Sequence, residues 1–319
     1  MEQTKTSYTA TNIQLMDSIN QWLEKHNQTQ SWLARLARIN ASTLNTVLAN
    51  KYPTSPSKWL NQAQQAIKHF EWQGVTGVVP TVNTSTFSLA QKVCQLARAD
   101  RTIATFTGVV GTGKTYALRH YTANTQNTYL VEADPGMTVT DLLDDLMGLI
   151  DLTCRPGARR NEKFRAITLA LKGTDSLLII DEAETMGAQS LHYVRRLRDK
   201  AGIGVVLAGT EHLTNLVRTT NPVFHQTGSR STINPKTIKG ITREDCDALS
   251  AAGLADIASE LDDSVLDMLW RYTHGSARLL AEGLIPNIRR VLNSGQHQLN
   301  ASLVDQVARN ILNLSGNAA

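Results

Sequence analysis

The sequence predicts an α/β protein, in which helices cover both faces of a parallel β-sheet, with an all-α domain before the sheet and a helical domain after it. Four short apolar segments alternate with helical stretches, an order typical of parallel sheets; they lie at 102–107, 128–133, 176–181 and 203–208. Helical periodicity without strand-like segments fills the chain before them and after about residue 236.

The composition bounds the class of protein. With 319 residues, of which 41% are apolar, the chain is long enough for two or three domains with real cores. No apolar run approaches the 18 residues of a membrane span, and the first residues lack a signal-peptide core. The three cysteines are too widely separated for a metal or disulfide pattern. We therefore expect a protein of a reducing cytoplasm, with no membrane partner.

The charge is unevenly distributed along the chain. The net charge is only +4, but residues 1–80 carry seven Lys and Arg against four Asp and Glu, whereas residues 241–319 carry six against ten. The front and the middle of the chain are therefore basic and the end is acidic. A basic front and middle indicate contact with a polyanion.

The first elements are helical and span residues 13–70. Within them, 30–52 predicts two short helices joined by a tight turn, with Ile39 at the turn and Ser42 capping the second helix. The inward side chains would be Leu33, Leu36, Ala37, Leu44, Val47 and Leu48. This pair resembles the helix-turn-helix of the λ-repressor-like family. Side chains that could then contact DNA are Ser42, Thr43, Asn45, Thr46 and Lys51. The alternative is a small helical bundle that docks on protein.

A segment rich in helix breakers follows. The stretch 74-GVTGVVPTVNTSTF-87 holds two glycines, one proline and several Ser and Thr, which is typical of a boundary. A helix near 87–98 then precedes the first strand. The predicted domains are a helix-turn-helix domain at 1–74, a linker at 75–86, an α/β core at 87–235 and a helical domain at 236–319.

The first predicted strand runs into 108-GVVGTGKT-115, a P-loop followed by a helical stretch. Glycine lets the backbone approach phosphates closely, and the loop N–H groups and the helix N-terminus can bind their oxygens. Lys114 would reach the β- and γ-phosphates, and the Thr115 hydroxyl would bind Mg²⁺. The predicted nucleotide-binding residues of the loop are Gly108, Val109, Val110, Gly111, Thr112, Gly113, Lys114, Thr115 and Tyr116.

Two later strands end in polar residues. In 177-LLIIDEAE-184, four apolar residues lead directly into carboxylates, as in a buried parallel strand that ends at a site. Asp181 would hold Mg²⁺ through water, and Glu182 would orient or deprotonate the attacking water. Thr210 ends 203-IGVVLAGT-210 and could touch the γ-phosphate or the water. Together with the P-loop, these features predict an ATPase that uses ATP and Mg²⁺.

A basic cluster lies in 154-CRPGARRNEKFR-165, where Arg155, Arg159, Arg160 and Lys163 stand against the single acid Glu162. The proline and glycine predict a loop that runs into a helix capped by Asn161. Such a cluster can bind a phosphate backbone without regard to sequence, or it can be a solvated charge run. A rival basic set, which fits a subunit interface as well as DNA, comprises Arg195, Arg196, Arg198 and Lys200.

After the last strand, amphipathic helices are predicted at 242–251, 263–273, 276–293 and 301–313. The order of P-loop, Asp-Glu pair, polar strand end and helical lid resembles that of AAA+ ATPases. The stretch 224-FHQTGSRS-231 resembles the region where initiator-type members carry an arginine finger, which implies Arg230, with Arg218 as the alternative. The stretch 274-HGSARLL-280 resembles the sensor 2 motif, which implies that Arg278 contacts the nucleotide of its own subunit.

With its amino-terminal helices, the whole chain resembles the phage Mu B family, which is related to TnsC. The resemblance implies a homo-oligomer that assembles on double-stranded DNA as a helical filament when ATP is bound, and that delivers target DNA to a MuA-like transposase and stimulates strand transfer. It also implies that the 154–165 region faces the DNA. The alternatives are a helicase loader of the IstB/DnaC type, an ExeA-like secretion ATPase, and a helix-turn-helix regulator with a nucleotide-sensing domain.

Overall fold

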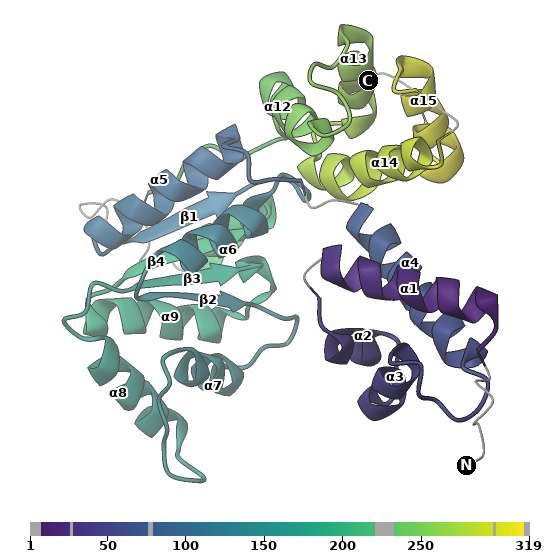
Figure 1. Ribbon diagram of the computed structural model, residues 1–319. Helices are drawn as coiled ribbons and strands as arrows, with labels where there is room; N and C mark the ends of the chain where they lie inside the picture. Colours follow the sequence, from purple (N-terminus) through teal and green to yellow (C-terminus); the bar gives the residue numbers. More distant parts are fainter. Residues whose placement is uncertain (1–7, 26–27, 76–78, 221–232, 296–297, 316–319) are drawn as a thin grey trace. The chain divides into compact units, whose positions relative to one another are not determined.

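The computed structural model describes residues 8–25, 28–75, 79–220, 233–295 and 298–315. The chain divides into two compact units (Figure 1). The first consists of Met1–Gly77 and Arg289–Gln296, and the second of Val78–Ile288 and His297–Ala319. Among the described residues, no helix combines the length and the apolar character needed to cross a membrane.

The first unit contains four amino-terminal helices. They are α1 (Ala10–Lys25), α2 (Gln30–Leu36), α3 (Ala41–Leu48) and α4 (Ser57–Val75). Their apolar faces meet in one core, where Leu33, Leu44, Val47 and Leu60 are completely buried. The predicted inward residues lie there, although Leu36 is only half-buried. The prediction of two short helices over 30–52 is confirmed, and their role in binding DNA stays a prediction.

The cap of α3 differs from the predicted one. Asn40, not Ser42, is the N-cap: its Oδ1 accepts the backbone N–H of Ser42 at 2.9 Å and the Ser42 hydroxyl at 2.7 Å. The helix begins at Ala41, two residues earlier than a Ser42 cap would allow, because Asn40 is still extended and its short side chain reaches the first exposed N–H groups. Asn45 and Lys51 are exposed, and Thr43 is half-buried.

The second unit is built on a four-stranded parallel sheet with the strand order β1-β4-β3-β2. The strands are β1 (Ile103–Thr107), β2 (Thr128–Glu132), β3 (Leu177–Asp181) and β4 (Gly204–Gly209). Each lies within one residue of its predicted position, and β1, β3 and β4 are buried throughout. The parallel α/β prediction is therefore confirmed.

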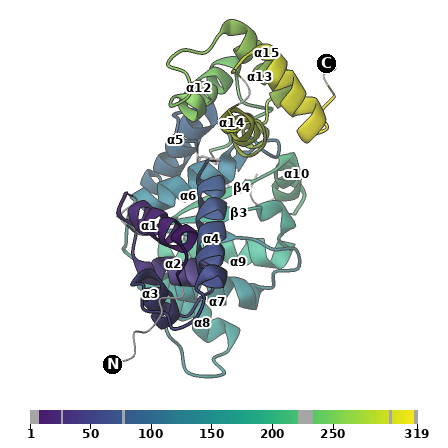
Figure 2. The same cartoon turned by 45° about the vertical axis from the view of Figure 1, so that its right-hand side comes forward.

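Helices cover both faces of this sheet, as Figure 1 and Figure 2 show. They are α5 (Ser85–Ala99), α6 (Lys114–Asn124), α7 (Val139–Leu149), α8 (Arg160–Leu171), α9 (Ala188–Ala201) and α10 (Glu211–Thr220). Successive strand residues point to opposite faces. Leu177 and Ile179 therefore pack with α5 and α6, while Leu178 and Ile180 pack with α7, α8 and α9.

The strand order brings the predicted motifs together. β4 lies between β1 and β3, so the P-loop after β1, Thr210 after β4 and Asp181 at the end of β3 share the carboxyl edge of the sheet. Ligands of open parallel sheets bind at this edge. On the outer side of β1, the stretch 233–238 covers the strand edge: Thr105 donates to Ile233 O at 2.8 Å and Ile238 donates to Thr107 O at 2.9 Å.

A helical lid closes the second unit. Its helices are α12 (Arg243–Leu254), α13 (Asp263–Thr273), a π-helix (Leu279–Leu284), the start of α14 (Ile285–Asn293), α15 (Ala301–Gln306) and a second π-helix (Val307–Ile311). The residues of α14 from Arg289 onward belong to the first unit. The four predicted helical segments are all present, and π-helical turns take part in the last two. The segment after the sheet is therefore helical, as predicted.

Candidate nucleotide-binding site

The P-loop connects the end of β1 to the first residue of α6, Lys114. Gly111 and Gly113 have φ values of 86° and 89°, in the left-handed region that favours glycine. A Cβ at Gly108 would lie 2.8 Å from the Cβ of Ile238, and one at Gly111 would lie 2.5 Å from the Ser276 hydroxyl. The loop is therefore packed too closely for side chains at these positions. Val109 and Val110, by contrast, are exposed.

Lys114 is buried, with 8% of its surface exposed, and its Nζ lies under the loop. The ammonium donates to the carbonyl oxygens of Gly108 at 2.8 Å and Val109 at 3.0 Å. Burial lowers the pKa of Lys114, and the charges of Asp181 and then Glu184 oppose that shift. The site thus holds a cation close to two carboxylates, where an anionic ligand would find a counter-charge.

Asp181 ends β3 and is almost completely buried. Its Oδ1 accepts the backbone N–H of Glu182 at 3.0 Å, whereas its Oδ2 has no hydrogen-bond partner within the described chain. A buried carboxylate oxygen without a partner is costly, and it fits a site that gains a ligand. Such an oxygen can receive a water of a hydrated Mg²⁺, because Mg²⁺ prefers oxygen ligands and retains water.

The next two polar residues differ in exposure. Glu182 is exposed and has a φ of 53°, a left-handed conformation that is uncommon for a side chain of this kind. Glu184 follows in a short 3₁₀ turn (Ala183–Thr185), and its Oε1 accepts the backbone N–H of Thr210 at 2.9 Å. Sequence reasoning missed Glu184. Its signal was the third carboxylate of the 181-DEAE-184 run.

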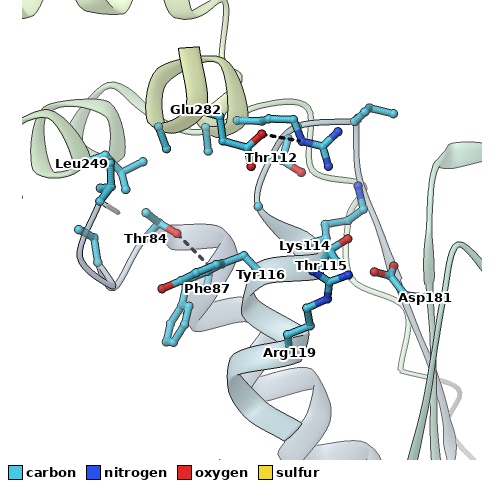
Figure 3. Close-up of a pocket in the computed structure, with 18 of the residues that line it drawn as sticks. Thr84, Phe87, Thr112, Lys114, Thr115, Tyr116, Arg119, Asp181, Leu249 and Glu282 are labelled. Atoms are coloured by element: carbon cyan, nitrogen blue, oxygen red, sulfur yellow. Dashed lines mark hydrogen bonds and ion pairs between the residues drawn. The ribbon is translucent and has the colours of Figure 1, made fainter. Parts of the chain in front are cut away.

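These residues line a cavity of about 480 Å³. At one end lie Lys114, Thr115, Asp181, Glu182, Glu184 and Thr210. The apolar residues that line it include Val79, Pro80, Val82, Phe87 and Leu249, and Leu249 lies at the opposite end. Figure 3 shows Lys114 and Asp181 at one side of the cavity and Thr84 and Leu249 at the other. The arrangement can therefore hold a ligand with a polyanionic end and a flat apolar end.

The apolar end was not predicted, because the breaker-rich segment before α5 was interpreted only as a linker. In the structure this segment contributes to the cavity wall and is held by two hydrogen bonds. The hydroxyls of Thr81 and Tyr116 lie 2.5 Å apart, and Thr84 Oγ1 accepts the backbone N–H of Phe87 at 3.2 Å. Tyr116, one of the predicted loop residues, thus ties the segment to the first turn of α6.

The lid reaches the P-loop through Arg278. Its backbone N–H donates to the carbonyl oxygen of Gly111 at 2.9 Å, and the residue lines the cavity. The guanidinium is 58% exposed and lies 4.0 Å from Glu282, at the outer limit of an ion pair. Arg119 of α6 also lines the cavity, where it pairs with Glu132 at 2.6 Å. The lid arginine thus lies at the cavity, and its contact with a nucleotide stays a prediction.

The two arginine-finger candidates cannot be compared in this way. Arg230 lies outside the described residues. Arg218 belongs to α10 by its backbone, but its side chain is also outside the described part of the structure. The choice of Arg230 over Arg218 stays a prediction.

The predicted basic cluster splits into two pairs in the structure. Arg155 forms an ion pair with Glu162 at 2.8 Å, and Lys163, only 16% exposed, pairs with Asp144 at 2.5 Å. Arg159 and Arg160 are exposed at the start of α8, and no ion pair engages either of them among the described residues. These two arginines are therefore the members of the cluster that are available to a polyanion.

The predicted cap of α8 was wrong. The helix begins at Arg160, one residue before Asn161, and Arg159 occupies the N-cap position. Glu162 takes the capping role, because it stands at the third helical position and its Oε2 can reach back to the Arg159 N–H at 2.9 Å.

The rival basic set on α9 is mostly engaged within the protein. Arg195 lies 3.7 Å from Asp199, which also pairs with Arg198 at 2.7 Å, and Arg198 donates to the carbonyl oxygen of Arg101 at 2.9 Å. Arg196 lies over the rings of Phe164 and Tyr193, at 5.1 and 5.4 Å from the ring centroids. Lys200 is exposed.

Comparison with known proteins agrees with this geometry. Residues 97–217 match the family model described as "AAA domain". The crystal structure of Cdc6p from Pyrobaculum aerophilum is similar in fold, with a TM-score of 0.56 and 18% identity over 70% of this chain and 66% of that one. The sheet, the P-loop and the helical lid thus define an ATPase of the AAA+ class.

Two curated proteins narrow the class. The Mu-like prophage FluMu DNA transposition protein B of Haemophilus influenzae is 28% identical over 203 residues, which are 62% of this chain and 69% of the relative. The ATP-dependent target DNA activator B of Escherichia phage Mu is 26% identical over 239 residues, which are 72% and 76% of the two chains. Within this class, the chain is similar to these two Mu B proteins, and the resemblance predicted from the sequence is confirmed.

Proposed function

We propose that this chain is an ATP-dependent, sequence-nonspecific DNA-binding protein that delivers target DNA to a transposase and stimulates strand transfer. The observation that carries the proposal is the cavity. It combines a P-loop, a buried lysine and an Asp181 oxygen that has no partner among the described residues with an apolar wall. The names of the two relatives, a transposition protein and a target DNA activator, support the biological role.

ATP would bind with its base against the apolar wall and its phosphates over the P-loop. Lys114 already donates two hydrogen bonds to loop carbonyls, so it is positioned to exchange them for β- and γ-phosphate oxygens. The Thr115 hydroxyl and, through water, Asp181 would hold Mg²⁺. The ion would neutralise charge on the phosphates. The backbone N–H groups of 110–113 would bind the remaining phosphate oxygens, whereas those of Gly108 and Val109 already donate to Gly209 and Ile238.

Hydrolysis would use groups at the ends of β3 and β4. Glu182 is exposed at the cavity and would orient or deprotonate the attacking water, while Thr210 would contact that water or the γ-phosphate. Arg278 would contact the nucleotide from the lid of the same subunit. Arg230 would act on the nucleotide of a neighbouring subunit, so hydrolysis should rise more steeply than linearly with protein concentration.

DNA would be bound through its phosphates. Arg159 and Arg160 are the exposed pair of the basic cluster, and contacts of this kind do not depend on base sequence. Arg155 and Lys163 could assist only by leaving their carboxylate partners. The α3 residues Thr43 and Asn45, with Lys51, would add a second contact. ATP would switch assembly of a helical filament on duplex DNA in the bacterial cytoplasm.

A gel-shift assay on random duplex DNA, with and without a non-hydrolysable ATP analogue, tests the proposal. We expect a shift on every duplex that strengthens with the analogue, and no such dependence for K114A. Binding to a single preferred sequence would instead indicate a regulator. DNA binding that does not change with the analogue would contradict the proposal that ATP switches assembly on DNA. The absence of any shift would overturn the DNA-binding role.

A further inference from the structure

Glu184 connects the ends of the two central strands. It follows β3 within the short 3₁₀ turn, and its Oε1 accepts the backbone N–H of Thr210, the residue after β4, at 2.9 Å. Both residues line the nucleotide cavity. The residue that would contact the γ-phosphate or the water is thus held by a carboxylate from the neighbouring strand.

Gly209 makes this contact possible. A Cβ at this position would overlap Glu184 Oε2 and would lie 2.9 Å from Glu184 Cδ, so any side chain here would displace the carboxylate. On its other side, the Gly209 carbonyl oxygen accepts the N–H of Gly108, the first P-loop residue, at 3.0 Å. The end of β4 is therefore fixed between the P-loop and Glu184.

Three oxygens around this junction are buried and, in the described part of the chain, without a hydrogen-bond partner. They are Asp181 Oδ2, Glu184 Oε2 and Thr210 Oγ1. Unpaired buried oxygens destabilise the site on their own and are typical of positions that gain partners when a ligand and its waters enter. The Thr210 hydroxyl is available for such a partner because Glu184 holds the backbone rather than the hydroxyl.

We propose that Glu184 is a positioning residue for ATP hydrolysis. Its hydrogen bond to the Thr210 backbone fixes the Thr210 hydroxyl at the phosphate end of the cavity, and Gly209 is required because it leaves room for the carboxylate. Glu184 acts through Thr210 and not as a second base. The inference rests on the ATPase activity and not on DNA binding, so its failure is distinguishable from failure of the proposed DNA-binding function.

The test compares E184A, E184Q and T210V by steady-state ATP hydrolysis in the full chain. E184A removes the acceptor, and we expect kcat to fall by about 10- to 100-fold, the range for removing a hydrogen bond to a charged group. E184Q keeps an oxygen acceptor of the same length and should retain kcat within about threefold. KM should stay near the wild-type value in both, because the nucleotide is bound by the P-loop.

A double variant decides whether the two residues act together. If Glu184 acts through Thr210, E184A/T210V should be no slower than the slower single variant within about threefold, because coupled groups are not additive. G209A should reproduce the E184A loss by displacing the carboxylate, which gives a second route if E184A does not fold. Binding of a fluorescent ATP analogue and the thermal unfolding midpoint serve as folding controls.

Three results would overturn the inference. Losses that multiply in the double variant would show independent roles. A kcat for E184Q as low as that for E184A would show that the negative charge, and not the acceptor, is needed. A rise in KM with unchanged kcat would place Glu184 in nucleotide binding.

Discussion

The nucleotide cavity and the basic surface of α8 and α9 use charge in opposite ways. In the cavity, Lys114 and Asp181 are buried, and Asp181 keeps an oxygen without a partner among the described residues. On the surface, most basic side chains already have partners, and Arg159 and Arg160 are the exposed pair of the predicted cluster. In the cavity, a buried oxygen without a hydrogen-bond partner indicates where a ligand binds. On the surface, exposure identifies the arginines that can contact DNA.

Replacing Lys114 should have the largest effect. K114A removes the buried ammonium that would bind the phosphates, so we expect ATP affinity to fall about 100-fold or more, equivalent to roughly 3 kcal/mol. Hydrolysis and ATP-dependent DNA binding should be lost with it. Titration with a fluorescent ATP analogue measures the affinity. The matched control is K172A, which removes an exposed lysine at the end of α8. Normal ATP affinity in K114A would contradict the P-loop assignment.

Glu182 should separate binding from hydrolysis. E182Q keeps the size of the side chain but cannot accept a proton, so we expect hydrolysis to fall about 100-fold while ATP affinity stays within about twofold. If ATP holds the protein on DNA, this variant should also dissociate from DNA more slowly. Fluorescence anisotropy after addition of competitor DNA and ATP measures the dissociation rate. Faster release by E182Q than by the wild type would argue against ATP as the switch.

Sequence analysis predicted the features that depend on neighbouring residues and missed those that depend on contacts between distant parts of the chain. The strands, the P-loop and Asp181 were predictable because apolar runs and glycine spacing are local. Glu184 was missed because its partner Thr210 follows another strand, and only the order β1-β4-β3-β2 brings them together. The wall formed by residues 79–82 was missed for the same reason: composition identifies a breaker-rich segment but not the cavity it lines.

The caps show a smaller, local failure. Ser42 and Asn161 are both good capping residues, yet the N-caps of α3 and α8 each lie two residues earlier, at Asn40 and Arg159. In α3 the neighbouring Asn40 is an equally good cap, and in α8 Glu162 caps the helix from inside. In both segments, several residues that can cap a helix lie close together in the sequence. Their capping preferences alone do not show which of them caps the helix.

On the basic surface, the exposed arginines should matter for DNA and the engaged ones should not. R159A/R160A should weaken binding to all duplexes alike, by about 10-fold at moderate salt. It should also reduce the log–log salt slope by about two units, close to one for each DNA phosphate that is no longer neutralised. ATP affinity should be unchanged. Binding isotherms on two unrelated duplexes at several salt concentrations measure both quantities.

R195A/R198A is the matched control, because it also removes two positive charges, but from α9, where both arginines contact Asp199. We expect its salt slope to equal that of the wild type. If R159A/R160A keeps wild-type affinity and slope while the control loses them, DNA is bound by α9 and not by the start of α8.

The smallest expected effect is on stability, at Arg196. Its guanidinium lies 5.1 Å from the ring centroid of Phe164, so it joins α9 to α8. R196A should lower the free energy of unfolding by about 1 kcal/mol, the size of a partly exposed cation–π contact. The unfolding midpoint should fall by roughly 2–4 °C. K200A, which removes an exposed charge one turn further along α9, should leave the midpoint unchanged. Because the ring belongs to the helix that carries Arg160, a loss of DNA affinity in R196A larger than its loss of stability would show that α9 also binds DNA. An unchanged affinity would confine the DNA contact to the exposed pair at the start of α8.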